Sequence, residues 1–163
     1  MTSLSIRLQN AIAAEEPLLR AISDHSAQTK PAPGKWSKKE ELGHLIDSAV
    51  NNRVRFVKAT LEGHYTGPGY QQDVWVELGG YADTPWTRII NLWKMSNEAL
   101  AGLVGRIPAE KLSAPCQVGN DGPVTLEFLI DDYILHMQHH LDHILSRENI
   151  TAYPRAKTSA TPD

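Results

Sequence analysis

The sequence predicts an all-α protein, a four-helix bundle with its helices in the order up-down-down-up. Four segments place apolar side chains at helical spacing: residues 4–22, 37–63, 84–104 and 125–147. Several of these segments open with residues that commonly cap a helix. Two long connections separate the last three segments, which allows the second and third helices to run parallel across a crossover. The fourth helix is then expected to run antiparallel to the second.

The first two helices are defined by apolar spacing and by a cap. Leu4, Leu8 and Ile12 begin the rhythm of the first helix, which is expected to reach about Ile22. Ser37 and Glu40 have the spacing of a capping box, in which each side chain bonds the other residue's backbone N–H. The second helix is therefore predicted from Ser37 to about Gly63.

The second half of the chain has clear turn and cap signals. Residues 64–83 form a connection too long to be a structureless loop in a compact domain, so it is either functional or partly structured. Thr84 and Pro85 have the form of an N-cap followed by proline at the first helical position. The GNDG sequence at 119–122 predicts a turn that joins two short strands. Thr125 is expected to cap the fourth helix.

Length and composition indicate one domain and exclude several classes of protein. The 163 residues suit a single domain over 1–148, followed by a weakly ordered tail over 149–163. The net charge of -3 and the lack of a basic run argue against a nucleic-acid partner. No apolar run reaches the length of a membrane span, and a signal peptide is not evident, so we expect no membrane role and a cytoplasmic location. A lone Cys116 excludes a cysteine-rich zinc site.

The fourth helix carries four of the seven histidines within eight residues. His136 and His140 are spaced i,i+4, as are His139 and His143, so each pair lies on one face of a helix. His136 and His140 border the apolar stripe, whereas His139 lies well off it. The apolar stripe consists of Leu126, Leu129, Ile130, Tyr133, Met137, Leu141, Ile144 and Leu145. A metal site in a bundle is built from side chains that point inward, so His136 and His140 are the better candidate ligands.

His44 on the second helix is ambiguous from spacing alone. It lies nearly opposite the apolar stripe of its helix, with Asp47, Asn51 and Arg55, and a histidine in that position usually faces solvent. The alternative is that this polar face lines a cleft in a partly open bundle. His44 and His140 each lie seven residues, about 10 Å, from the end of their helices. If those helices are antiparallel neighbours, the histidines lie at one height.

Three segments resemble the DinB/YfiT family of metalloenzymes. They read KWSKKEELGHLIDSAVNNRVRF, GYQQDVWVELGGYADTPWTRIINLWKMSN and VTLEFLIDDYILHMQHHLDHIL. The resemblance implies a four-helix bundle with a divalent metal held by three histidines. Those histidines are implied to be His44, His136 and His140, with the polar face of the second helix turned toward a cleft.

Three imidazoles leave coordination places open, which is typical of a catalytic metal site. We expect zinc or nickel, with iron, manganese or copper as alternatives. The resemblance implies either a metal-dependent hydrolase or a thiol S-transferase that uses a low-molecular-weight thiol. Hydrolysis usually needs a carboxylate base near the metal, for which Asp47 and Asp132 are candidates, and either one is equally suited to orient a histidine. A thiol ionised by the metal needs no such base, which favours the transferase.

The remaining expectations concern the substrate and possible partners. Asn51, Arg55, Tyr70 and Trp75 are candidate contacts for the thiol or for another small substrate. Arg53 and Arg55 are suited to pair with a carboxylate of an anionic thiol, and an ion pair within the bundle explains Arg53 equally well. The long connection is expected to close the cleft. A non-enzymatic alternative is a metal-stabilised stress-response module for binding or dimerisation, and a helical bundle of this kind commonly forms a homodimer.

Overall fold

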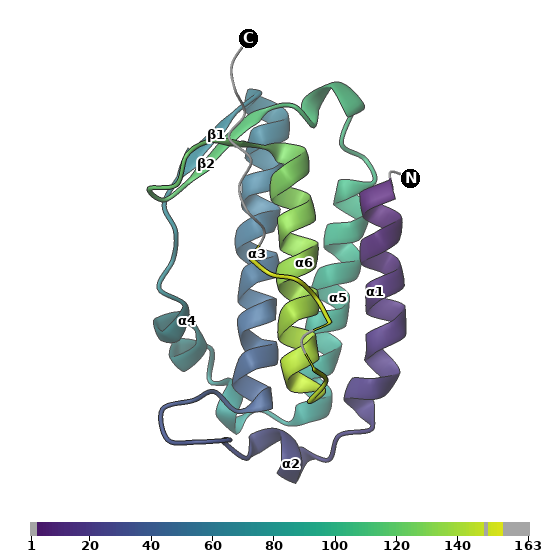
Figure 1. Ribbon diagram of the computed structural model, residues 1–163, viewed down its shortest axis with the longest axis vertical. Coiled ribbons are helices and arrows are strands. Elements are labelled where there is room, and N and C mark those ends of the chain that lie inside the picture. Colours follow the sequence, from purple (N-terminus) through teal and green to yellow (C-terminus); the bar gives the residue numbers. More distant parts are fainter. Residues whose placement is uncertain (1–2, 149, 155–163) are drawn as a thin grey trace.

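The computed structural model describes residues 3–148 and 150–154 and shows the predicted four-helix bundle. Its four long helices are α1 (Ser3–Arg20), α3 (Lys38–Glu62), α5 (Trp86–Val104) and α6 (Leu126–Ile144). α3 and α5 run parallel, and α1 and α6 run opposite to them (Figure 1). The order up-down-down-up and the antiparallel pairing of the second and fourth long helices are therefore confirmed.

Local capping explains where three of the helices begin. The Ser37 hydroxyl accepts a hydrogen bond from the Glu40 N–H, and Glu40 Oε2 accepts one from the Ser37 N–H, so the predicted capping box opens α3. Thr125 caps α6 through the Phe128 N–H. The predicted start of α5 was wrong by one residue, because Pro85 is the cap and the Thr84 hydroxyl donates to the Gly80 carbonyl instead.

A short helix that the sequence did not reveal takes over the capping of α5. In α2 (Asp24–Gln28), Asp24 Oδ1 accepts the Trp86 N–H at 2.7 Å, so a carboxylate distant in sequence binds the first N–H of α5. The other long helices end slightly earlier than predicted. α6 stops at Ile144 rather than near Arg147, whose guanidinium pairs with Glu15 and Asp142.

The connection between α3 and α5 is partly structured, which is one of the two alternatives that its length indicated. It contains β1 (Tyr65–Gly67), α4 (Gln72–Gly79) and the 3-10 turn η1 (Tyr81–Asp83), and α4 lies beside α3 on the outside of the bundle (Figure 1). β1 pairs in parallel with β2 (Pro115–Val118), which pairs antiparallel with β3 (Val124–Thr125). A further 3-10 turn, η2 (Ala109–Lys111), precedes β2. The small sheet therefore covers the end of the bundle where α3 ends and α6 begins.

The hydrophobic core lies between the four long helices. Trp86 and Trp93 on α5 and Phe56 on α3 are its largest fully buried side chains. The Trp86 indole N–H donates to the Leu19 carbonyl at 2.9 Å, which attaches α5 to α1. Over residues 3–148 and 150–154, no helix combines the length and apolar character needed to cross a lipid bilayer.

The expected weakly ordered tail falls mostly on residues 149 and 155–163, which lie outside the described residues. Residues 150–154 are described and turn back along α6. The Thr151 N–H donates to Asp142 Oδ2 at 3.0 Å, which holds this segment against the helix. As a result, Tyr153 lies beside the histidines of α6.

Candidate metal centre

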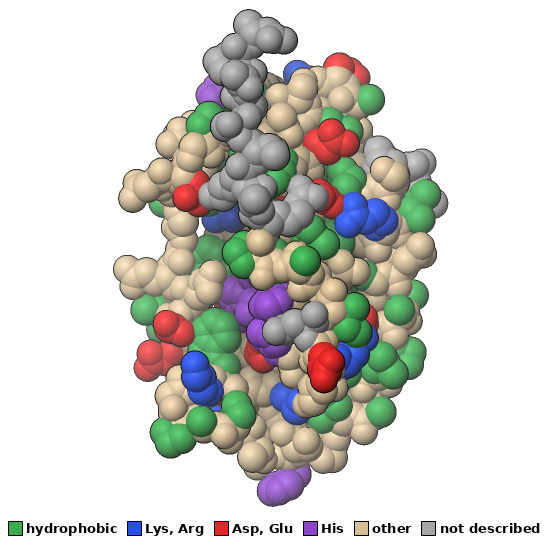
Figure 2. Space-filling model, viewed as in Figure 1, with side chains coloured by type: hydrophobic (Ala, Val, Ile, Leu, Met, Phe, Trp, Pro, Cys, Tyr) green, Lys and Arg blue, Asp and Glu red, His purple; other side chains and the backbone are tan. Residues whose placement is uncertain are grey.

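Three histidines from two helices meet at the middle of the bundle. His44 of α3 faces His136 and His140 of α6, with ring centroids 5.1 and 4.8 Å away, and the two α6 rings are 4.6 Å apart. Nε2 of His44 lies 3.2 Å from Nε2 of His136. Figure 2 shows a group of histidine side chains near the centre of this face of the molecule.

This arrangement fits a divalent cation. Each histidine offers a ring nitrogen, and the three nitrogens lie within 4.8 Å of one another. Two nitrogens bound to one zinc ion at about 2.0–2.1 Å lie about 3.3 Å apart at a tetrahedral angle. The 3.2 Å separation of the two Nε2 atoms is close to that value. The chain can therefore hold a cation here while leaving further coordination places open.

Burial keeps two of these imidazoles, those of His44 and His136, in the neutral form that binds metals. Desolvation, helped by the neighbouring His140, lowers the pKa of His44 to about 4. The pKa of His136 is lowered still further, first by desolvation and then by the charges of His140 and His44. Both rings therefore carry an available lone pair at neutral pH.

Glu41 is a contributor that the sequence reasoning missed. Its Oε1 lies 2.9 Å from Nδ1 of His140, a contact that favours the tautomer with the proton on Nδ1 and leaves Nε2 for a cation. The signal was present in the sequence, since Glu41 lies three residues before His44 and so shares its side of the helix. Glu41, His140 and His143 also form a second, more exposed group with suitable spacing for a cation.

His44 is fully buried, so the expectation from apolar spacing that it faces solvent was wrong. Trp36 and Tyr70 lie against it, with ring centroids 5.1 and 6.5 Å away. The polar face of α3 is covered here by the crossover segment. Further along α3 this face lines a cavity, in agreement with the alternative of a cleft.

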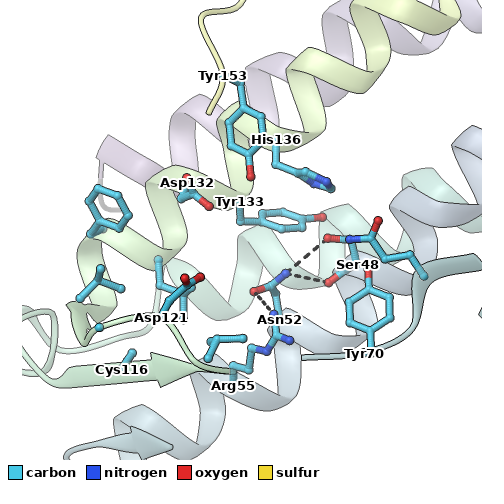
Figure 3. A pocket seen from close by; sticks show the side chains of 16 residues that line it. Ser48, Asn52, Arg55, Tyr70, Cys116, Asp121, Asp132, Tyr133, His136 and Tyr153 are labelled. Carbon is cyan, nitrogen blue, oxygen red and sulfur yellow. Dashed lines mark hydrogen bonds between the residues drawn. The ribbon is translucent and has the colours of Figure 1, made fainter. Parts of the chain in front are cut away.

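The cavity has a volume of about 190 Å³ and runs from His136 along α3 and α6 toward the small sheet. Figure 3 shows His136 and Tyr153 at one end and Arg55 and Cys116 at the other, with Asn52 between them. Its polar lining consists of Ser48, Asn52, Arg55, Tyr70, Gln72, Asp121, Asp132, Tyr133, His136 and Tyr153. Tyr70 and Arg55, which the sequence suggested as substrate contacts, both face this cavity.

The two candidate carboxylates differ in position. Asp132 lines the cavity, and its carboxylate accepts a hydrogen bond from Tyr153, whose pKa is raised to about 12 mainly by burial. Asp47 is buried outside the cavity lining and accepts the Tyr81 hydroxyl at 2.7 Å. Burial raises the pKa of Asp47, and its second oxygen has no hydrogen-bond partner among the described residues.

Two other candidate residues lie away from the cavity. Asn51 donates its side-chain amide to the Asp47 carbonyl and borders a separate groove on the outside of α3. Trp75 borders the same groove and packs edge-on against Tyr70 at 5.3 Å. Tyr70 and Arg55 border both the outer groove and the cavity, and Trp75 packs against Tyr70 on the side of the groove. Cys116 faces the cavity, but burial raises the pKa of its thiol to about 11, so it remains a weak nucleophile.

The fold and the histidines together define a helical-bundle protein with a candidate three-histidine metal centre. The chain belongs to the DinB superfamily, whose family model matches residues 7–144.

Comparisons with individual proteins agree with this assignment. Proteins of Bacillus cereus (strain AH820) and Bacillus anthracis (strain A0248) are 26% identical over 132 residues, which cover 79% of this chain and 76% of theirs. They are provisionally named metal-dependent hydrolases.

Two solved structures share the fold. YfiT from Bacillus subtilis, described as a probable metal-dependent hydrolase with an unusual four-helix bundle topology, has a TM-score of 0.78 at 19% identity. The match covers 90% of this chain and 87% of YfiT. A mycothiol-dependent maleylpyruvate isomerase has a TM-score of 0.67 at 11% identity, over 92% of this chain and 62% of the isomerase.

Proposed function

We propose that this protein is a metal-dependent thiol S-transferase, which joins a low-molecular-weight thiol to a small electrophile. His44, His136 and His140 would hold the cation beside the cavity, which His136 lines. A divalent cation bound there supplies a Lewis acid that favours the thiolate over the thiol at neutral pH. Zinc and nickel are the expected ions, because both accept imidazole nitrogen.

The observation that carries this proposal is that, among the described residues, the group formed by the three histidine nitrogens includes no carboxylate oxygen. Glu41 contacts His140, Asp47 accepts the Tyr81 hydroxyl, and Asp132 accepts the Tyr153 hydroxyl. Hydrolysis usually requires a carboxylate that can take a proton from the attacking water. Attack by a thiol that has already lost its proton requires no base in the protein.

The proposed reaction balances without a further reagent. The thiol gives its proton to solvent, its sulfur forms a bond to an electrophilic carbon, and a halide leaves with the electron pair of the broken bond. With an epoxide, the carbon–oxygen bond opens and the oxygen takes up a proton. Tyr70 and Tyr153 line the cavity in which these steps would take place.

A metal-dependent hydrolase is the second candidate. The provisional names of the Bacillus relatives favour it, and so does Asp132, which lies in the cavity one turn before His136. A tyrosine hydroxyl that donates to a carboxylate does not prevent that carboxylate from accepting another proton. The two candidates therefore differ in the product they form.

One screen tests both candidates. The metal-loaded protein is incubated with small thiols and either chlorodinitrobenzene or an epoxide, and separately with ester and amide substrates. We expect a thioether product that disappears after chelation and in His136→Ala. Hydrolysis without conjugation would replace the transferase by the hydrolase, and the lack of either product would leave a non-catalytic binding module.

A further inference from the structure

Arg55 is a buried cation without an acidic partner in the part of the chain that the structure describes. Only 8% of its surface is exposed, and its guanidinium lies 6.0 Å from the centre of the Tyr70 ring. Its Nη1 donates a long hydrogen bond, 3.4 Å, to Oδ1 of Asn52. Among the described residues, no carboxylate oxygen lies within 4.0 Å of the Arg55 guanidinium.

The other arginines of the described chain behave differently. Arg7, Arg20 and Arg147 form ion pairs with Asp131, Glu16 and Glu15, respectively. Arg53, Arg88 and Arg106 are exposed to solvent. A buried charge is costly and is normally paired. The position of Arg55 therefore has an energetic cost that the described contacts do not offset.

Arg55 lies at the far end of the cavity from the histidines. His44, Ser48, Asn52 and Arg55 follow one face of α3, and Arg55 lies three turns beyond His44, about 16 Å along the helix axis. Side chains on a helix lean toward its N-terminus, so the guanidinium approaches the histidine end of the cavity. Figure 3 shows Asn52 between Arg55 and His136 on the way through the cavity.

We infer that Arg55 binds a carboxylate of a small molecule whose reactive end reaches the histidine centre. A guanidinium donates two parallel hydrogen bonds to a carboxylate. The Asn52 amide already donates to the carbonyl and the hydroxyl of Ser48, so Arg55 is the donor that remains for the anion. The statement that the bound molecule reacts at the histidine centre rests on the proposed function, whereas the anion site at Arg55 does not.

The volume of the cavity limits the size of the bound molecule. The cavity volume is about 190 Å³. Sites for drug-sized ligands are usually about 300–1,000 Å³. The structure therefore favours a compact monocarboxylate over a large peptide-like molecule.

Binding to the metal-free protein tests the anion site independently of catalysis. Straight-chain carboxylates from propanoate to octanoate, and the matching neutral amides, are titrated into the protein and followed by NMR. We expect at least one carboxylate to bind the wild type and Arg53→Gln equally, and to bind Arg55→Gln at least tenfold more weakly. Arg53 is a matched control because it lies on the same helix, is exposed and does not line the cavity. Equal binding to Arg55→Gln, or no binding by any carboxylate, would overturn the inference.

Thermal unfolding separates a binding role from a structural one. Because the described structure gives Arg55 no ion pair, we expect Arg55→Gln and Arg55→Met to unfold at the same temperature as the wild type or at a higher one. Arg55→Lys should retain part of the carboxylate binding. A clear loss of melting temperature in both neutral variants would assign Arg55 to the support of the fold and contradict the inference.

Kinetics with two substrate pairs show which substrate carries the carboxylate that Arg55 binds. In the first pair a mercaptocarboxylate reacts with a neutral electrophile, so the thiol carries the carboxylate. In the second pair a neutral thiol reacts with a carboxylated electrophile. Arg55→Gln should raise KM in one pair and leave kcat nearly unchanged. Carboxylate binding without any conjugation would reject the proposed function and leave the anion site intact.

Discussion

His44 is surrounded by aromatic and imidazole rings rather than by water. Trp36 and Tyr70 lie on its sides, and His136 and His140 lie in front of its Nε2 atom. Burial disfavours the imidazolium form in such a place. The same residue type on a solvent-facing helix surface would titrate near its ordinary pKa and bind a metal only in competition with protons.

The three histidines make a prediction about metal binding. Each of His44→Ala, His136→Ala and His140→Ala should reduce the metal content from about one divalent ion per chain, because each removes one ligand of an open site. Elemental analysis of the purified variants measures this. His139→Ala is the control, since its ring lies outside the group of three.

Two results would assign the ion elsewhere. Loss of metal in His139→Ala but not in His136→Ala would favour the other i,i+4 pair on α6. Loss in His143→Ala together with full binding in His44→Ala would place the ion at the exposed group formed by Glu41, His140 and His143.

Glu41 is predicted to act on the metal through His140. Glu41→Gln removes the negative charge that holds the Nδ1 proton of His140, and such changes typically weaken metal affinity about 10–100-fold. Competition with a chromogenic chelator measures the affinity. Glu62→Gln, at the exposed end of the same helix, should leave it unchanged. Equal affinity in Glu41→Gln and the wild type would show that Glu41 does not orient the ligand.

At the scale of elements, α3 owes its burial to the crossover that follows it. All residues from 42 to 49 are buried, although helical spacing assigns only one side of this stretch to the bundle core. The other side is covered by α4 and η1. Tyr81 of η1 reaches α3 and donates its hydroxyl to Asp47.

Gly43 is what permits this close approach. A Cβ atom added at Gly43 would lie 2.1 Å from Cδ2 of Tyr81, a distance that the buried ring cannot accept without moving. Gly43→Ala should therefore displace Tyr81, break its hydrogen bond to Asp47, and lower the free energy of unfolding by about 1–3 kcal/mol. Chemical denaturation measures the loss.

The matched control is Gly69→Ala, because a Cβ at Gly69 meets no atom within 4 Å. It should leave stability within about 0.5 kcal/mol of the wild type. If Gly43→Ala is as stable as Gly69→Ala, the packing of η1 on α3 is looser than the structure indicates.

On the scale of the whole molecule, the site is held by segments from both ends of the chain. Arg147 pairs with Glu15 of α1 and with Asp142 of α6, and Asp142 also binds the backbone of Thr151. These contacts place Tyr153 with its ring 5.5 Å from that of His136. The histidine centre is thus enclosed by α3, α6, the crossover and the segment that follows α6.

Enclosure predicts how stability depends on pH in the metal-free protein. The pKa of His44 is lowered to about 4 and that of His136 is lowered as well, whereas an unfolded histidine titrates near 6.5. Between these pH values the two histidines bind protons in the unfolded chain but remain neutral in the folded chain. Stability therefore falls as the pH is lowered from about 6.5 toward 4. Each histidine contributes at most about 1.4 kcal/mol per pH unit.

Thermal unfolding across this pH range checks the prediction. The stability of His136→Gln should fall less steeply with decreasing pH than that of the wild type. This variant lacks one histidine that binds a proton in the unfolded chain but not in the folded one. His25→Gln, which changes an exposed histidine, should follow the wild type. An unchanged slope in His136→Gln would mean that the folded protein accepts the proton at His136.

The sequence alone determined the bundle, the positions of its long helices and their directions. Apolar spacing, the Ser37 capping box and the length of the 64–83 connection are local properties, and they are sufficient for these features. Local spacing also favoured His136 and His140 over His139 as neighbours of the core, while His44 was chosen through the family resemblance.

Only the tertiary structure decided which side of α3 is buried and what His44 faces. That side is covered by a crossover and by aromatic residues whose position depends on contacts such as Tyr81 to Asp47, which no helical periodicity contains. The role of Glu41 beside His140 and the isolation of Arg55 likewise depend on distances between α3 and its neighbours. A spacing pattern records which residues share a face of a helix, but the fold determines what that face meets.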